Sequence, residues 1–188
     1  MPTPTLRRAT GCAPAGVLSP GAACATGLLG QCRCFLEGLH DDVYARESRT
    51  MMRGTIGKHT RHSLDHFAAA LSGFGRHAEE IDYDHRQREV PMETSRAAAI
   101  SAIRAMNDSL VSIGPEADGQ PVRVRLMLSG DGALGAFTST LGRELAFAAH
   151  HALHHHAMMR VIADEFGVVC PPDFGKAPST VHFEHSTH

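Results

Sequence analysis

The sequence of 188 residues predicts an all-α protein that folds as a four-helix bundle. Two observations lead to this fold class. Four segments of about twenty residues repeat apolar side chains at intervals of three and four, the pattern of an amphipathic helix, and four such helices can bury their apolar faces together. Segment 121–139 is the exception, because it alternates apolar and polar residues and predicts a small β-hairpin between the third and fourth helices.

The first two helices are marked by their start signals. The first expected helix covers about 20–39, because the pair Ser19-Pro20 is a typical helix start. The second covers about 55–74, with Thr55 as its N-cap. Apolar residues follow each start at helical spacing, so each helix has one face for the core.

The last two helices flank the expected hairpin. The third covers about 94–113 and the fourth about 139–166. Between them, segments 121–129 and 133–139 alternate in strand fashion on either side of the turn at 130–132. The connections are longer than a tight turn between helices, so they permit a crossover along the bundle.

The chain is expected to form one domain, since its length suits a single hydrophobic core. Residues 19–181 form the expected bundle domain. Residues 1–18 form a disordered N-terminal extension, and residues 182–188 form a flexible tail.

Composition argues against several classes of protein. Lys and Arg number 18 against 20 Asp and Glu, without a block of either sign, which argues against a nucleic-acid binder. No run of 18 apolar residues indicates a membrane span. The five cysteines are odd in number and irregularly spaced, so they do not form a disulfide framework, and free thiols predict a cytoplasmic location.

Five of the fourteen histidines lie within residues 150–156. Residues four apart on a helix share a face, so His151 and His155 can direct two imidazoles at one point, where a divalent transition metal fits. The spacing lacks the glutamate of the His-Glu-x-x-His metalloprotease motif. A third ligand must therefore come from elsewhere in the chain.

The second expected helix carries another stripe of histidines. His59, His62 and His66 lie three and four residues apart, so they share one side of that helix. One of them can complete a three-histidine site if this helix packs beside the fourth. Three neutral imidazoles leave at least one coordination position open, as in catalytic metal sites, whereas four protein ligands close a structural site.

Three questions stay open at this point. The histidines can form a hydrogen-bonded cluster that holds no metal. Asp65 can accept an N–H from a ligating imidazole, or it can form an ion pair with Arg61, four residues before it. Arg86 and Arg88 lie in a charged loop that either closes over the site or is simply solvated.

Several segments resemble the DinB-like, or YfiT-type, family of proteins. Segment 55–67 is similar to their second-helix motif, in which a Ser/Thr-Ile-Gly start is followed by a metal-binding histidine at the position of His62. Segment 141–155 is similar to the part that holds the family's His-x-x-x-His pair. Segments 82–94 and 173–180 resemble one bacterial subgroup, most of which is uncharacterised.

The resemblance covers about residues 20–181 and implies an up-down-down-up bundle that binds a divalent metal through His62, His151 and His155. The resemblance favours zinc or nickel as the metal, and iron and manganese also suit such sites. Characterised relatives include thiol S-transferases, maleylpyruvate isomerases that use a low-molecular-weight thiol, and thiol-ligase domains of sulfoxide synthases. Many relatives follow the final histidine with Arg-Gly-Gln, whereas residues 156–158 here are His-Ala-Met, so the substrate side of the pocket differs.

The expected function is that of a metal-dependent transferase or hydrolase, in which the metal activates a water or thiol nucleophile. His59, His66 and Asp65 are the candidates for catalytic support or proton transfer beside the ligands. The expected partners are a small-molecule substrate, such as a low-molecular-weight thiol, and a second copy of the chain in a homodimer. The alternative function is that of a non-catalytic metal-binding or stress-response helical bundle.

Overall fold

The computed structural model describes residues 17–75, 80–84 and 90–187. Its long helices are α1 (Pro20–Glu37), α3 (Ile56–Ser72), α4 (Arg96–Leu110) and α5 (Leu141–Glu165). Its shorter helical elements are α2 (Asp41–Tyr44), η1 (Pro91–Glu93), η2 (Pro115–Gly119) and α6 (Pro178–Ser186). Its strands are β1 (Ile81–Asp82), β2 (Pro121–Met127) and β3 (Leu134–Thr140).

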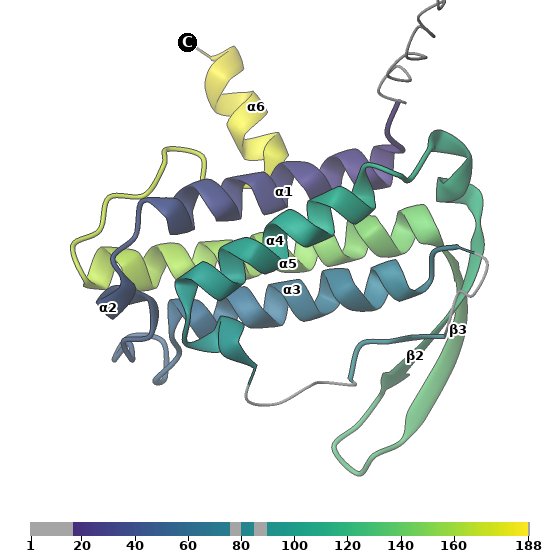
Figure 1. Ribbon diagram of the computed structural model, residues 1–188, viewed down its shortest axis with the longest axis horizontal. Coiled ribbons are helices and arrows are strands. Elements are labelled where there is room, and N and C mark those ends of the chain that lie inside the picture. Colours follow the sequence, from purple (N-terminus) through teal and green to yellow (C-terminus); the bar gives the residue numbers. More distant parts are fainter. Residues whose placement is uncertain (1–16, 76–79, 85–89, 188) are drawn as a thin grey trace, which may run out of the picture.

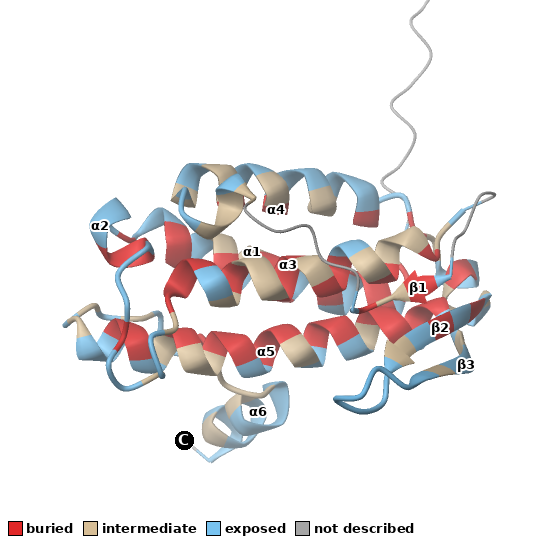
Figure 2. Cartoon of the chain, turned by 90° about the horizontal axis from the view of Figure 1, so that it is seen from below, coloured by how far each residue is buried: buried red, intermediate tan, exposed pale blue. Residues whose placement is uncertain are grey.

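The four long helices pack side by side around one apolar core (Figure 1). α1 and α5 run in one direction, and α3 and α4 run in the opposite direction. α1 and α3 each contact both α4 and α5. Figure 2 shows buried residues along most of the length of α5, which makes this helix central to the packing.

Each long helix begins at a serine or threonine N-cap. The cap hydroxyl accepts a hydrogen bond from the backbone N–H three residues further on: Ser19 from Ala22, Thr55 from Lys58, Ser95 from Ala98 and Thr140 from Arg143. Such a cap stabilises a helix by about 1 kcal/mol. The start signals predicted at Ser19 and Thr55 are therefore confirmed.

A three-stranded sheet lies at the end of the helices where α3 ends and α5 begins (Figure 1). β2 pairs antiparallel with β3, with Val124 opposite Phe137, and β1 joins β2 in parallel, with Ile81 opposite Val124. Thr140 is both the last residue of β3 and the N-cap of α5. The sheet is thus joined directly to the start of α5.

The predicted all-α class is wrong. The described residues contain six α-helices and a three-stranded mixed sheet, so the fold mixes α and β structure and is not a pure four-helix bundle. Ile81 is fully buried and pairs with β2, which turns the expected hairpin into a sheet. A strand of two residues carries too little alternation to be recognised from sequence. The four long helices and the β2–β3 pair lie where periodicity predicted them.

The sequence analysis expects a disordered extension at the N-terminus and a flexible tail at the C-terminus. Residues 1–16 of the expected N-terminal extension lie outside the described residues. Residues 182–186 of the expected tail are helical and complete α6. In the ranges that the structure describes, no helix is both long and apolar enough to cross a membrane.

Candidate metal centre

α3 and α5 pack against each other in opposite directions and bring two stripes of histidines face to face. His59, His62 and His66 come from α3, and His151 and His155 come from α5. Imidazole rings meet across the helix interface in four pairs: His59 with His155, His62 with His151, His62 with His155, and His66 with His151. These five residues form one group, which we call the five-histidine cluster.

Three members of the cluster converge most closely. His62, His66 and His151 each offer a ring nitrogen, and these three atoms all lie within 4.8 Å of one another. The rings of His66 and His151 are stacked, with centroids 3.8 Å apart, and the ring of His62 lies 4.7 Å and 4.9 Å from theirs. This set can hold a metal ion between the two helices.

His155 lies beside this group, and its two ring nitrogens each lie within hydrogen-bond distance of another histidine. Its Nε2 is 3.1 Å from Nε2 of His151, and its Nδ1 is 2.9 Å from Nδ1 of His59. Two imidazole nitrogens on one tetrahedral zinc ion are about 3.3 Å apart, given Zn–N bonds of 2.0–2.1 Å. The pair His151 and His155 therefore also has the spacing of two ligands. The triad expected from the sequence, His62, His151 and His155, differs from the most convergent set in one member.

Burial favours the neutral form of two members of the cluster, His155 and His59. Burial lowers the pKa of His155 to about 3, assisted by the charges that His62, His151, His59 and His154 would carry. Burial also lowers the pKa of His59, and a charge on His154 adds to this. A neutral imidazole keeps the lone pair that a metal ligand needs, so at neutral pH His155 and His59 do not have to lose a proton to bind a cation.

The ring of His66 is fixed from two sides. Its Nδ1 is 3.1 Å from the backbone oxygen of His62, so Nδ1 carries the proton and Nε2 is the nitrogen with the lone pair that a metal would bind. The ring of Tyr83 stacks on it, with centroids 5.2 Å apart and planes inclined by 23°. Tyr83 is in turn held by its hydroxyl, which donates a 2.7 Å hydrogen bond to the carboxylate of Glu144. A ligand that is oriented in this way loses less conformational freedom when it binds a metal.

Glu144 is a buried carboxylate beside the cluster that the sequence did not reveal. Its side chain is 1% exposed, and it accepts hydrogen bonds from Tyr83, from Ser139 at 2.6 Å and from Arg143 at 2.7 Å. Burial alone would raise the pKa of this carboxyl, but the three donors outweigh it and lower the pKa. A glutamate in the first turn of a helix is common for electrostatic reasons alone, so only the fold distinguishes this one.

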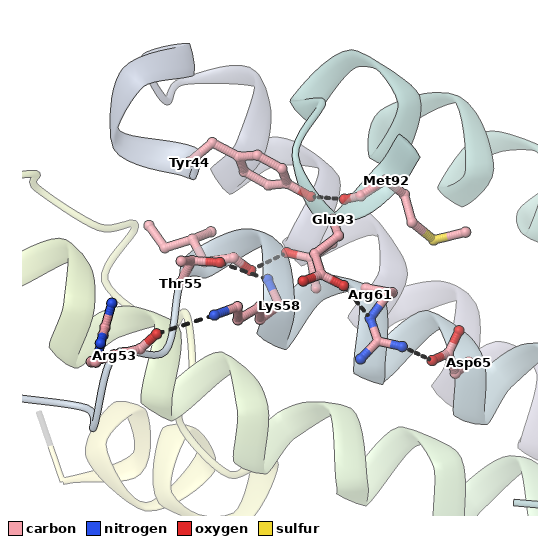
Figure 3. Close-up of polar contacts among 10 residues, drawn as sticks. Tyr44, Arg53, Thr55, Lys58, Arg61, Asp65, Met92 and Glu93 are labelled. Carbon is pink, nitrogen blue, oxygen red and sulfur yellow. Dashed lines mark hydrogen bonds and ion pairs between the residues drawn. The ribbon is translucent and has the colours of Figure 1, made fainter. Parts of the chain in front are cut away.

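Asp65 lies in an ion pair at the junction of α3 and η1 (Figure 3). Its carboxylate is 3.0 Å from the guanidinium of Arg61, which lies 3.0 Å from Glu93 on its other side. Nearby, the hydroxyl of Tyr44 donates a 2.5 Å hydrogen bond to the backbone oxygen of Met92. These contacts attach η1 to the first turns of α3.

Arg86 and Arg88 of the charged loop lie outside the described residues.

The remaining histidines of the run 150–156 point elsewhere. His150 and His154 are exposed. His156 is buried on another side of α5, where it stacks on Phe174 with ring centroids 4.9 Å apart. Burial lowers the pKa of His156 to about 4. His156 therefore belongs to the core.

We expect the metal-free protein to lose stability as the pH falls below about 6.5, the pKa of an unfolded histidine. The folded pKa of His156 is about 4, so between these values the unfolded chain binds more protons than the folded one, and acid favours unfolding. His156→Phe keeps the stacking on Phe174 and removes this titration. Melting temperatures at pH 7.5 and pH 5 should therefore differ less in His156→Phe than in the parent. His150→Phe is the control, because His150 is exposed, and an equal effect of both variants would contradict the assignment.

Comparisons with known proteins assign no family to the chain. No family model matches it, and no solved structure matches it. One protein with a similar sequence is FK506-binding protein 5 of Rhizopus delemar, which is 32% identical over 102 residues. The match covers 54% of this chain and 26% of the relative, so this chain spans about a quarter of that relative's length. This partial similarity neither supports nor excludes the DinB-like resemblance.

Proposed function

We propose that the chain is a metal-dependent enzyme that binds one divalent transition metal ion through His62, His66 and His151. The observation that carries the proposal is the convergence of their ring nitrogens within 4.8 Å between α3 and α5. Three imidazole ligands leave a coordination position open, which is the arrangement of a catalytic site. Imidazole donors suit zinc and nickel, and they also suit iron.

A metal at this position would lower the pKa of a bound water or thiol and so supply a nucleophile at neutral pH. The chain's own residues prepare the site for this. Tyr83 and the backbone oxygen of His62 fix the ring of His66. The Nδ1 atoms of His59 and His155 share one hydrogen bond, so one ring is the donor and the other the acceptor. His155 also lies next to the ligand His151, with 3.1 Å between their Nε2 atoms, so the pair supports that ligand from outside the proposed triad.

The proposed reaction is a transfer or hydrolysis on a small molecule, with a thiol or water as the nucleophile. A thiol as nucleophile or substrate fits a reducing cytoplasm, where we propose that the protein acts. Four cysteines among the described residues are free, which is consistent with that compartment: Cys24, Cys32, Cys34 and Cys170.

One observation favours a second candidate function, a non-catalytic metal site. The 3.1 Å between the Nε2 atoms of His151 and His155 suits two ligands of the same ion. If His155 binds together with His62, His66 and His151, four imidazoles close the coordination shell. The ion would then be structural or sensed, as in a metal-binding or stress-response bundle.

Cobalt substitution distinguishes the two candidates. We expect the visible absorption bands of the Co²⁺-loaded protein to shift when azide or 2-mercaptoethanol is added, because the open position takes up the added ligand. The same additions to Co²⁺ in buffer are the control for binding outside the protein. Unchanged bands in a protein that retains its full cobalt content would contradict the catalytic proposal and support the closed, structural site.

A further inference from the structure

A cavity of about 490 Å³ lies between the sheet and the first turns of α5. Its walls are mainly apolar, with the aromatic rings of Tyr83, Phe137 and Phe147 and the aliphatic side chains of Val124 and Leu126. Its volume is in the range of pockets that bind small molecules. We call it the hairpin cavity, because β2 and β3 supply much of its wall.

The hairpin cavity shares two of its walls with the five-histidine cluster. The ring of Tyr83 stacks on His66, as described above. The ring of Phe147 lies 6.1 Å from that of His151 and 6.2 Å from that of His66, and it meets Tyr83 edge-on at 5.2 Å. One layer of aromatic rings therefore separates the cavity from two of the proposed metal ligands.

Arg143 gives the cavity a positive group. Its guanidinium lies 5.5 Å above the ring of Phe147, and its side chain is 66% exposed. Within the described part of the chain it donates one hydrogen bond, from Nη1 to Glu144, so its remaining N–H groups can serve a ligand. An arginine with two free N–H groups matches the two oxygens of a carboxylate.

Glu144 does not cancel this charge for a ligand in the cavity. Its carboxylate is buried and accepts from Tyr83, Ser139 and Arg143. Glu144 also lines the cavity, but its oxygens are already taken up by these three donors, whereas Arg143 keeps N–H groups for a ligand. An uncharged or cationic molecule would gain nothing from Arg143, whereas an anionic one would gain a charge-assisted hydrogen bond.

We propose that the hairpin cavity binds the non-reacting part of the substrate, and that this part is a flat apolar body carrying a carboxylate held by Arg143. The inference rests on the proposed function, because it places the reacting end of the substrate at the metal beyond Phe147. Binding energy gained from a part remote from the reaction can position the reacting end at the metal. The aromatic walls favour a flat apolar body, and Arg143 favours a negative charge on that body.

The test uses 2-naphthoate and its uncharged analogue 2-naphthylmethanol as probes, with metal-free protein in isothermal titration calorimetry. We expect 2-naphthoate to bind about tenfold more tightly than the alcohol, the effect of one charge-assisted contact. Arg143→Gln should bring the two dissociation constants to within about twofold of each other. Arg123→Gln is the matched control, because Arg123 is an exposed arginine on β2 whose side chain points to the other face of the sheet from Val124.

The use of metal-free protein separates this inference from the proposed function. A protein that fails to bind metal would overturn the proposed function, and with it the role of the cavity as a substrate site, while the naphthoate result would be unchanged. Equal binding of the acid and the alcohol would overturn the inference even in a protein that binds metal normally. So would an acid preference that survives in Arg143→Gln. Far-ultraviolet circular dichroism confirms that each variant is folded.

Discussion

Replacement of either His62 or His151 by alanine is expected to abolish metal binding. Each residue supplies one imidazole to the proposed site, and both belong to the triad predicted from the sequence as well as to the most convergent set in the structure. Loss of one ligand from a three-ligand site should reduce the metal content from about one ion per chain to below about 0.2. Mass spectrometry of the metals in protein purified without chelators and equilibrated with Zn²⁺ measures this content.

The same helix offers controls for this experiment. His150→Ala and His154→Ala remove exposed histidines within the run 150–156, and both variants should keep their metal. Comparison of His66→Ala with His155→Ala then identifies the third ligand. A large loss in His66→Ala alone would support the set proposed here, and a large loss in His155→Ala alone would support the triad implied by the family resemblance. A full metal content in His62→Ala would show that His62 is not a ligand and would contradict the proposed site.

Gly57→Ala is expected to destabilise the fold strongly. A Cβ atom at this position would lie 2.0 Å from the backbone oxygen of Glu93 and 2.9 Å from Cε1 of Tyr44, so η1 would have to move away from α3. Overpacking of this kind costs about 1–3 kcal/mol. The backbone oxygen cannot turn aside as a flexible side chain can. Urea denaturation followed by circular dichroism measures the loss in the free energy of unfolding.

Gly30→Ala is the matched control for Gly57→Ala. Gly30 lies inside α1, and a Cβ atom there would meet no other atom within 4 Å. Alanine favours a helix interior over glycine by about 1 kcal/mol, so this variant should be more stable than the parent. If both variants were equally stabilised, the close approach of η1 to Gly57 would not exist in solution.

The sequence is sufficient to predict the four long helices because two independent signals coincide in them. Apolar residues recur at helical spacing, and Ser19 and Thr55 mark the starts of α1 and α3. The fold class was wrong because β1 consists of two residues whose pairing with β2 depends on contacts distant in the chain. Local patterns carry no information about such a pairing.

The candidate site is predictable only in part, for a geometric reason. His59, His62 and His66 are spaced so that all three face α5, and spacing alone cannot decide which of them approaches His151. The outcome depends on the rotation of α3 about its own axis, which the packing of the whole core determines. Glu144 and Tyr83 lie 61 positions apart in the sequence, and their hydrogen bond could not be inferred before the sheet placed them together.

Tyr83 connects the five-histidine cluster with the hairpin cavity. One face of its ring supports His66 in the five-histidine cluster, and the same side chain forms a wall of the hairpin cavity. A ligand that fixes Tyr83 from the cavity also lowers the cost of ordering His66 for a metal. Because such linkage is reciprocal, a metal on His66 must strengthen the binding of that ligand by the same factor. Glu144, which accepts a hydrogen bond from the Tyr83 hydroxyl, holds the side chain that the two sites share.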